Sequence, residues 1–185
     1  MLFNRALRIL LITNTLVLIA GGMLGPIYAL FVEDIGGRLL DASIAIAIFA
    51  AVAGITTIVA GKHTDRAKRK EFIVGIGYAL MGISFLLYIF ADSVYFIFGI
   101  VILTGFAEAL YAPAFDSLFS QHTTKRKVGL EWGTWEATDY FAGAFGAITG
   151  GALVTLFGFN VLFMAMAALC FISAIYIYFL PRRVL

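Results

Sequence analysis

Three carboxylic acids lie inside long apolar stretches of this sequence and are its best candidates for binding chemistry. Glu108 lies near the middle of one stretch, whereas Glu136 and Asp139 lie towards the start of the next. Neither stretch contains a Lys or Arg that could pair with these acids. An unpaired carboxylate in lipid is costly unless it meets water, a cation or a proton. We therefore expect these acids to face a wet cavity and to bind protons or cations.

Helical spacing groups other polar residues with the acids or with one another. Residues three or four positions apart share a helix face, which places Tyr111 beside Glu108. Asn14 is also compatible with an interhelical hydrogen bond, Glu136 with the membrane interface, and the tyrosines with ordinary packing. The candidate residues for binding substrate or protons are Glu108, Asp139, Glu136, Asn14, Tyr28 and Tyr111.

The stretches that position these residues are long enough to cross a membrane as helices. The chain is 62% hydrophobic and 13% charged, with a mean hydropathy of +1.00. A helix needs about 20 apolar residues to cross the hydrocarbon core, and continuous stretches favour helices over barrel strands. We expect an all-α integral membrane protein, one domain over residues 1–185, with transmembrane helices at 6–31, 39–60, 72–91, 94–119, 132–157 and 161–180.

The basic residues predict how the helices are oriented. Of the thirteen Lys and Arg residues, only Arg38 falls in a loop on the side opposite to all the others. The others precede the first helix, fill the loops before the third and fifth helices, or follow the last helix, as Arg182 and Arg183 do. Because Lys and Arg accumulate in short cytoplasmic loops, we expect both termini in the cytoplasm of a cell with this protein in its plasma or inner membrane. This bias accounts for the basic loops without a nucleic-acid partner.

The loop between the second and third helices carries a recognisable motif. It reads Gly61, three residues, Asp65-Arg66, and then a basic run that includes Arg69. This pattern resembles the same loop of the major facilitator superfamily, although Lys68 stands where that family usually has a second Gly. The resemblance implies that Gly61 ends the second helix and that the loop latches the cytoplasmic side, with Asp65 at the N-terminus of the partner half's fifth helix. The gating residues implied are Gly61, Asp65, Arg66 and Arg69, with Asp116 placed to pair with the basic loop, for instance with Arg69.

The fifth helix carries a glycine motif that resembles the one found in antiporters of this superfamily. Its spacing is matched, although Ala142 and Ala147 replace one Gly and the Pro of the family pattern. Gly146 and Gly150 form a small-xxx-small pair, which allows two helix backbones to approach closely in lipid. The residues expected to serve helix packing are Gly143, Gly146, Gly150 and Gly151.

The resemblance covers the chain as one six-helix half-bundle of a twelve-helix family. In that family the substrate site lies between two halves related by an axis along the membrane normal. Two parallel copies of a six-helix chain would supply both walls, so we expect a homodimer. The alternatives are the truncated N-terminal half of a twelve-helix transporter, and a non-transporting membrane scaffold or accessory subunit.

The resemblance also implies secondary active transport by alternating access, with efflux favoured by the antiporter motif. The lack of basic residues near the acids favours an organic cation or a neutral amphiphilic molecule over an anion. The proton gradient is the expected energy source, because no Gly-rich nucleotide loop is present. We expect no cofactor, no metal and no enzymatic activity, since the lone Cys170 and the loop residues His63 and His122 lack companion ligands.

Overall fold

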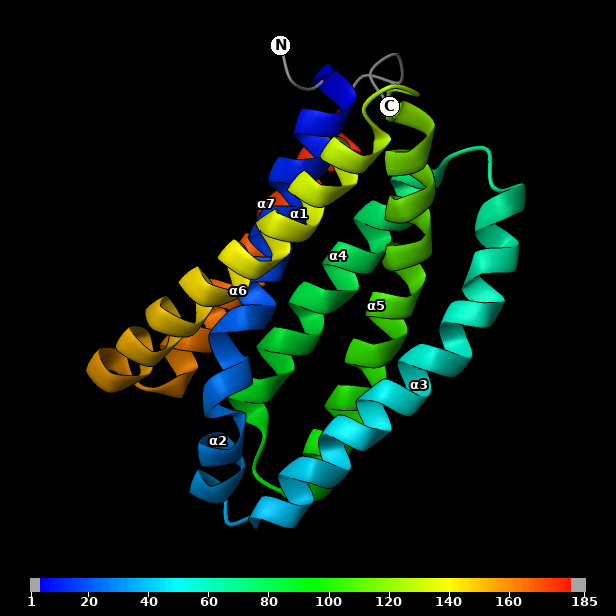
Figure 1. The fold of residues 1–185 in the computed structure, drawn as a ribbon. Helices are drawn as coiled ribbons and strands as arrows, with labels where there is room; N and C mark the ends of the chain where they lie inside the picture. Colours follow the sequence, from blue (N-terminus) through cyan, green and yellow to red (C-terminus); the bar gives the residue numbers. More distant parts are fainter. Residues whose placement is uncertain (1–3, 181–185) are drawn as a thin grey trace.

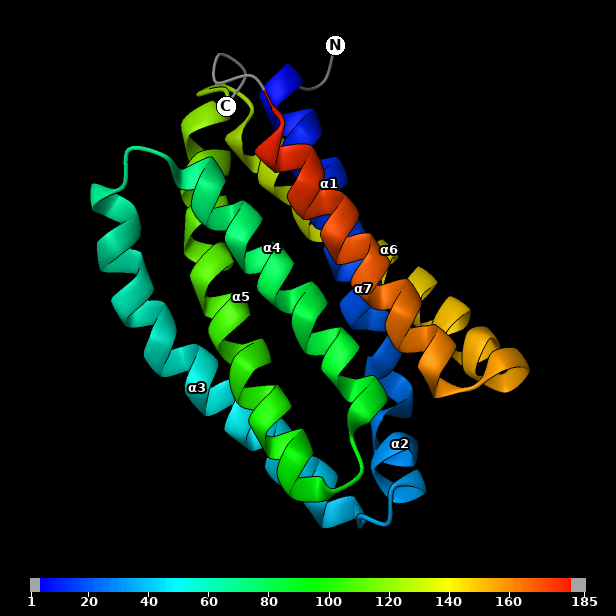
Figure 2. The same ribbon diagram turned by 180° about the vertical axis from the view of Figure 1, so that it is seen from behind.

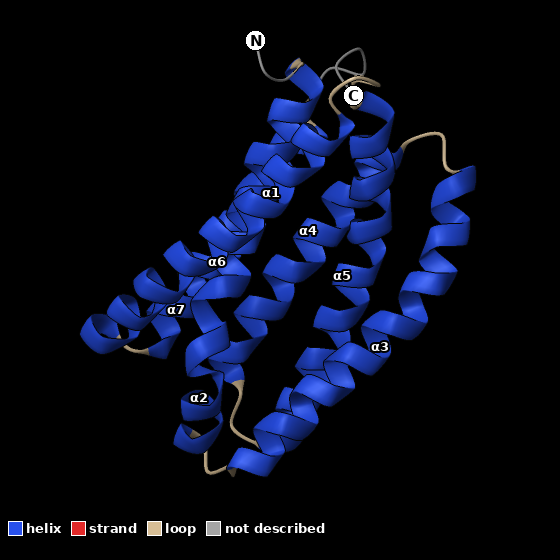
Figure 3. Ribbon diagram, viewed as in Figure 1, coloured by secondary structure: helices blue, strands red, loops and turns tan. Residues whose placement is uncertain are grey.

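The computed structural model describes residues 4–180, which form a bundle of helices joined by short loops (Figure 1). The described residues contain no strand (Figure 3). Arg182 and Arg183, which contributed to the predicted orientation, lie outside the described residues. The helical segments are α1 (Arg5–Leu24), η1 (Gly25–Ile27), α2 (Tyr28–Asp34), α3 (Leu39–Arg66), α4 (Lys70–Leu87), η2 (Tyr88–Phe90), α5 (Val94–His122), α6 (Val128–Phe157) and α7 (Phe159–Tyr178).

Six of the helical spans are long and apolar enough to cross a membrane, which confirms the expected number. Segments α1, η1 and α2 together make the first span, and α4 with η2 makes the third. The six spans are Arg5–Asp34, Leu39–Arg66, Lys70–Phe90, Val94–His122, Val128–Phe157 and Phe159–Tyr178.

The first span is interrupted where Gly25 and Pro26 form the 3-10 turn η1. Proline lacks a backbone N–H and its ring crowds the preceding helical turn, so the α-helical hydrogen-bond pattern stops there. The chain then resumes as α2, which begins at Tyr28. Tyr28, the first residue of α2, lies in the wall of a cavity described below.

The second span does not end at Gly61, contrary to the expectation from the loop motif. Helix α3 continues through Asp65 to Arg66 and ends at Ala67, whose backbone is extended (φ −74°, ψ 130°). The last turns of α3 are mostly exposed and polar, so they need no apolar environment to stay helical. Apolar run length therefore marks the part that crosses lipid, whereas the helix itself extends into the interface.

The helices pack as two groups that meet along α4 and α7. One group contains α1, α6 and α7, and the other contains α3, α4 and α5. Figure 2 shows α4 and α7 side by side on one face of the bundle. On the opposite face, shown in Figure 1, α1 and α6 lie to one side and α3 and α5 to the other. The core between the groups contains large buried side chains such as Tyr78, Phe115 and Phe163.

Glycines bring α1 and α6 into backbone contact. A Cβ on Gly146 would lie 2.6 Å from the Ile19 carbonyl oxygen, and one on Gly150 would collide with the Met23 backbone. A Cβ on Gly22 would lie 3.0 Å from the Cα of Gly143. Close approach through small residues is a common way for helices to associate in lipid. The packing role expected for Gly146 and Gly150 thus lies within this chain, whereas a Cβ on Gly143 or on Gly151 would meet nothing within 4 Å.

The start of α1 and the end of α7 lie at the same end of the bundle (Figure 1). The basic loops 67–69 and 123–127 lie at this end too, because α3 and α5 run towards it. Arg38 lies at the opposite end, where it precedes α3. The charges are therefore segregated as the sequence suggested, and the assignment of this end to the cytoplasm stays a prediction.

Helices α3 and α6 are the least covered of the spans. In their most apolar windows, 11% and 17% of residues are buried, against 39% to 44% for the other spans. In Figure 1 these two helices lie at opposite edges of the bundle. The exposed surfaces of α3 and α6 are apolar, with side chains such as Ile55 and Ile58 on α3 and Phe141 and Ile148 on α6.

Candidate functional site

A cavity of about 420 Å³ lies between the two helix groups, and we call it the central cavity. Its walls come from α1, η1, α2, α3, α4, η2, α5 and α6. Tight packing of α6 on α1 and of α3 on α5 fixes two of these walls. A Cβ on Gly105 of α5 would lie 2.8 Å from the Phe49 carbonyl oxygen, so α3 and α5 touch directly beside the cavity.

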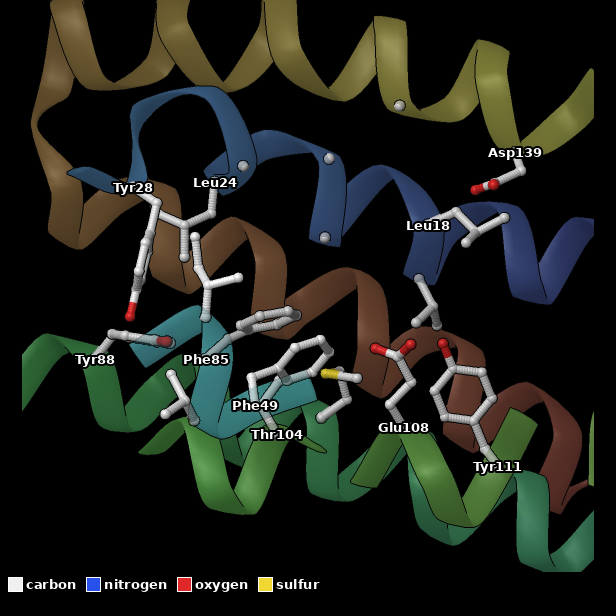
Figure 4. A pocket seen from close by; sticks show the side chains of 18 residues that line it. Leu18, Leu24, Tyr28, Phe49, Phe85, Tyr88, Thr104, Glu108, Tyr111 and Asp139 are labelled. Carbon is white, nitrogen blue, oxygen red and sulfur yellow. The ribbon is translucent and has the colours of Figure 1, made fainter. Parts of the chain in front are cut away.

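Glu108 and Asp139 enter the central cavity from opposite walls. Figure 4 shows the Glu108 carboxylate rising from α5 and the Asp139 carboxylate pointing in from α6, with Leu18 of α1 between them. Both side chains are half-buried. Among the described residues that line the cavity, none is a Lys or Arg. The structure thus brings together the two acids that the sequence singled out most strongly and gives them no basic partner there.

Tyr111 lies at the same end of the cavity as Glu108. Its hydroxyl lies beside the Glu108 carboxylate in Figure 4. The Tyr111 ring packs edge-on against Tyr78, with the ring centroids 4.9 Å apart. Because Tyr111 is only 8% exposed, its position is set by this packing. A phenol held there can donate a hydrogen bond to the carboxylate or line the path of a ligand.

The other end of the cavity is aromatic. Tyr28 and Tyr88 meet edge to face with ring centroids 6.4 Å apart, and both lie far from the acids in Figure 4. The Tyr28 hydroxyl is buried and has no hydrogen-bond partner among the described residues. Between the two ends the wall is apolar and includes Leu24, Phe49 and Phe85. The cavity is therefore acidic at one end and largely apolar along the rest of its length.

Asn14 does not line the cavity. It is 3% exposed, and its Oδ1 accepts a hydrogen bond of 3.0 Å from the Tyr78 hydroxyl. This bond joins α1 to α4 inside the core, close to the 2.9 Å bond that the Ser173 hydroxyl donates to the Thr13 carbonyl. The interhelical alternative considered for Asn14 is the arrangement observed here.

Glu136 also lies outside the cavity lining and is exposed on α6. Trp132 and Trp135, on the same helix, pack against Phe119 and Phe115 of α5, with ring centroids 4.9 Å and 6.1 Å apart. These contacts hold the loop ends of α5 and α6 together. Glu136 lies about one turn nearer this loop end than Asp139, and of the two only Asp139 lines the cavity.

The expected gating residues occupy two places. Asp65 and Arg66 are exposed in the last turn of α3. Gly61 lies further back within the same helix. The Arg69 Nε lies 3.4 Å from the Glu71 Oε1, so in this structure Arg69 pairs with Glu71 and not with Asp116. Asp116 is exposed on α5, and its neighbour Ser117 accepts a 2.6 Å hydrogen bond from the Lys70 Nζ.

Sequence reasoning missed several residues that shape this region. Phe49, Phe85 and Tyr88 line the cavity from α3, α4 and η2, and only tertiary packing reveals them. Glu131 was missed because α6 begins at Val128 rather than at Trp132. It is 1% exposed, and its Oε2 accepts a 2.7 Å hydrogen bond from the Thr124 backbone, which ties the loop to the helix. The available signal was an acid directly before the predicted helix start, because carboxylates are favoured near helix N-termini.

The described residues contain no group of three or more His, Cys, Asp or Glu side chains that could hold a metal ion. The lone Cys170 is buried in α7. The chemistry of the central cavity therefore rests on its two carboxylates and on the aromatic and apolar side chains around them.

Comparisons with known proteins agree with the fold. A family model described as Major Facilitator Superfamily matches residues 10–184. An uncharacterized MFS-type transporter of Methanocaldococcus jannaschii is 26% identical over 167 residues, covering 90% of this chain and 43% of the relative. Multidrug resistance protein MdtG of Dickeya zeae is 24% identical over 181 residues, covering 94% and 43%. The protein of that name in Erwinia billingiae is 25% identical, covering 97% and 44%. The chain thus spans less than half the length of these relatives.

Proposed function

This chain belongs to the major facilitator superfamily, and from that membership and its central cavity we propose that it exports amphiphilic organic cations in exchange for protons. The observation that carries the proposal is a pair of carboxylates, Glu108 and Asp139, which face one cavity from two helices. None of the described residues that line this cavity is a Lys or Arg. The chain is a membrane protein with several spans in a family of transporters. Two of the relatives are named multidrug resistance proteins, which supports the direction of efflux.

The shape and charge of the cavity favour a substrate with one cationic group and an apolar body. A cationic head placed between Glu108 and Asp139 gains charge-assisted contacts, which are stronger in a cavity shielded from water. The apolar body then lies along Leu24, Phe49 and Phe85. Aromatic walls also attract cations through their π faces. An anionic substrate would meet two acids and no compensating Lys or Arg in this lining.

Proton coupling follows from competition for the same oxygen atoms. A protonated carboxyl group has lost the charge that holds a cation, whereas a bound cation favours the charged form. The two ligands therefore exclude each other when the carboxylates are shared. Alternating access converts this exclusion into exchange, because a site that faces one side binds the cation and then returns with a proton.

We propose that a second copy of the chain forms the missing wall of the cavity. Helices α1, α3, α5 and α6 line the central cavity, and the poorly covered α3 and α6 lie at opposite edges of the bundle in Figure 1. Exposing a cavity with two acids to lipid costs free energy, because a charged side chain is poorly solvated by hydrocarbon. A parallel homodimer would place the α3 and α6 faces against those of the partner and enclose the cavity. A second six-helix half in a longer chain would supply a wall of the same kind.

Asp65 has a proposed role in latching this assembly. It is exposed at the end of α3, at the end of the bundle that carries the basic loops. In a dimer it would meet the N-terminus of the partner's helix α6, where free backbone N–H groups attract a carboxylate. This contact would stabilise the state in which the cytoplasmic side is closed.

Equilibrium binding of ethidium, a permanently charged aromatic cation, tests the proposal. The purified protein in detergent should bind ethidium more tightly as the pH rises from mildly acidic to neutral, because fewer protons then compete with the cation for the cavity. In weakly buffered solution, binding should also release protons. A double variant, Glu108→Gln with Asp139→Asn, should lose both effects. Ethidium affinity that does not change with pH, without proton release, would contradict the exchange mechanism.

A further inference from the structure

A second and smaller cavity, of about 260 Å³, lies in a groove between α4 and α7 on the face of the bundle shown in Figure 2. We call it the α4–α7 groove. In the part of the chain that the structure describes, no residue lines both this groove and the central cavity. Apart from Glu71 at one end, its walls are apolar, and they include Phe72, Ile76, Ala79, Phe171, Ile175 and Tyr178.

Small residues keep this groove open. Gly75 and Ala79 lie on α4 and Ala174 lies on α7, so short side chains face each other along part of its length. A Cβ on Gly75 would lie 3.8 Å from the Ala174 carbonyl oxygen, which is an ordinary contact distance. The larger side chains Phe72 and Tyr178 stand at the loop end, with ring centroids 6.5 Å apart. The groove is therefore a shallow apolar channel with aromatic edges.

A guanidinium group lies at the loop end of the groove. The Arg69 Cζ lies 5.4 Å from the centroid of the Phe72 ring, which is one wall of the groove. The Arg69 Nε contacts the Glu71 Oε1 at 3.4 Å, while the Arg69 side chain remains 54% exposed. The preceding Lys68 is exposed as well. The ring contact and the ion pair thus hold a cation at the groove, and basic residues outnumber the single acid there.

The selectivity of such a groove among lipids must come from the headgroup. A lipid tail gains little from moving between the bilayer and the groove, because the two environments are equally apolar. Arg69 offers a planar set of N–H donors that matches two oxygen atoms of a phosphate. Basic residues near the membrane surface attract anionic lipids, and pockets of this kind between helices bind their headgroups.

We propose that the α4–α7 groove binds one anionic phospholipid, with an acyl chain along the apolar channel and the phosphate on Arg69. The site lies on the face formed by α4 and α7 in Figure 2, opposite to the face that Figure 1 shows. It is therefore available in the lone chain, in a dimer and in a longer protein. Binding there does not depend on whether the central cavity transports cations.

Native mass spectrometry of the detergent-purified chain tests this site with two probes of identical acyl chains, phosphatidylglycerol and phosphatidylcholine. The parent protein should bind its first phosphatidylglycerol about fivefold more tightly than phosphatidylcholine, the effect expected for one basic residue at an anionic headgroup. Arg69→Gln should remove this preference. Arg126→Gln, an equal charge change in the exposed loop before α6, should keep it.

The channel itself is tested by Ala79→Phe, which places a ring in the groove and should weaken binding of both lipids. Equal affinity of the parent protein for the two lipids would overturn the proposal, as would equal losses of preference in Arg69→Gln and Arg126→Gln. If Ala79→Phe fails to fold, the two exposed arginine variants decide the question without it. Unchanged binding in a folded Ala79→Phe protein would place the lipid elsewhere.

Discussion

Glu108 and Asp139 have a shared environment that determines what each can bind. They face one cavity, and its described lining contains no Lys or Arg to neutralise them. Coulomb attraction for a cation is stronger where water is partly excluded, and two carboxylates add their fields. A cation between them is therefore held by both acids, whereas an acid elsewhere on the same helix contributes little. Glu136, exposed on α6, provides that comparison.

Asp139→Asn should weaken ethidium binding about tenfold or more, because it removes one charged partner of the cation. Glu136→Gln changes charge on the same helix, outside the cavity lining, and should leave the affinity within about twofold. Fluorescence titration of the purified variants measures both. Equal effects of the two substitutions would show that the net negative charge of α6 attracts the cation, and not a carboxylate in the cavity.

The sequence indicates some of these residues more readily than others, for a physical reason. Glu108 and Asp139 stand out because acids are rare in apolar spans, and that signal is local. Whether a polar side chain faces a cavity or a neighbouring helix depends on how its helix is rotated in the bundle. Asn14 and Tyr28 were both candidate binding residues, yet Asn14 bonds Tyr78 in the core and Tyr28 lines the cavity.

At the scale of helices, the contact between α1 and α6 supports one wall of the cavity. Gly146 and Gly150 leave no room for a side chain against Ile19 and Met23, so the two helices lie in backbone contact. Asp139 precedes these glycines on the same helix and enters the cavity past α1. The position of the Asp139 carboxylate in the central cavity thus depends on Gly146 and Gly150.

Gly150→Ala should destabilise the protein by about 1 to 3 kcal/mol, because the new methyl group meets the Met23 backbone and forces the helices apart. Gly151→Ala is the matched control, since its Cβ would meet nothing within 4 Å. That change should be neutral or stabilise the helix by up to about 1 kcal/mol. Thermal unfolding in detergent measures both. A Gly150→Ala protein as stable as Gly151→Ala would contradict the close α1–α6 packing.

Helix number was predictable from the sequence, and helix ends were less so. Crossing lipid requires a long apolar run, so run length identifies the six spans directly. The ends lie in the interface, where polar residues also form helix, so α3 passes Gly61 and α6 starts at Val128. The interruption at Pro26 has a local cause that was visible in the sequence, but the place of Tyr28 in the cavity wall was not.

At the scale of the whole molecule, the charge distribution is strongly one-sided. The basic loops before α4 and α6 lie at the end of the bundle where α1 begins and α7 ends. Arg38 lies at the other end, next to the exposed acids Glu33 and Asp34. From the positive-inside rule we predict that the first end faces the cytoplasm.

Single cysteines can test this orientation, because the lone Cys170 is buried and can be replaced by serine. Lys125→Cys and Glu33→Cys place exposed thiols at opposite ends of the bundle. A membrane-impermeant maleimide should label Glu33→Cys in intact cells and label Lys125→Cys only after the membrane is opened. The reverse pattern would invert the topology, and with it the side from which Asp65 acts.

The central claim is that Glu108 couples cation movement to the proton gradient, and one transport measurement tests it most directly. Ethidium transport into proteoliposomes is followed with and without an imposed pH gradient for the parent protein, Glu108→Gln and the exposed control Glu33→Gln. Glu108→Gln leaves the cavity with one carboxylate in place of the pair that the proposed exchange requires, so the gradient dependence should be abolished. We predict a folded Glu108→Gln protein without gradient-driven transport, beside a Glu33→Gln protein that behaves as the parent. Gradient-driven ethidium transport at the parental rate in a folded Glu108→Gln protein would contradict the account.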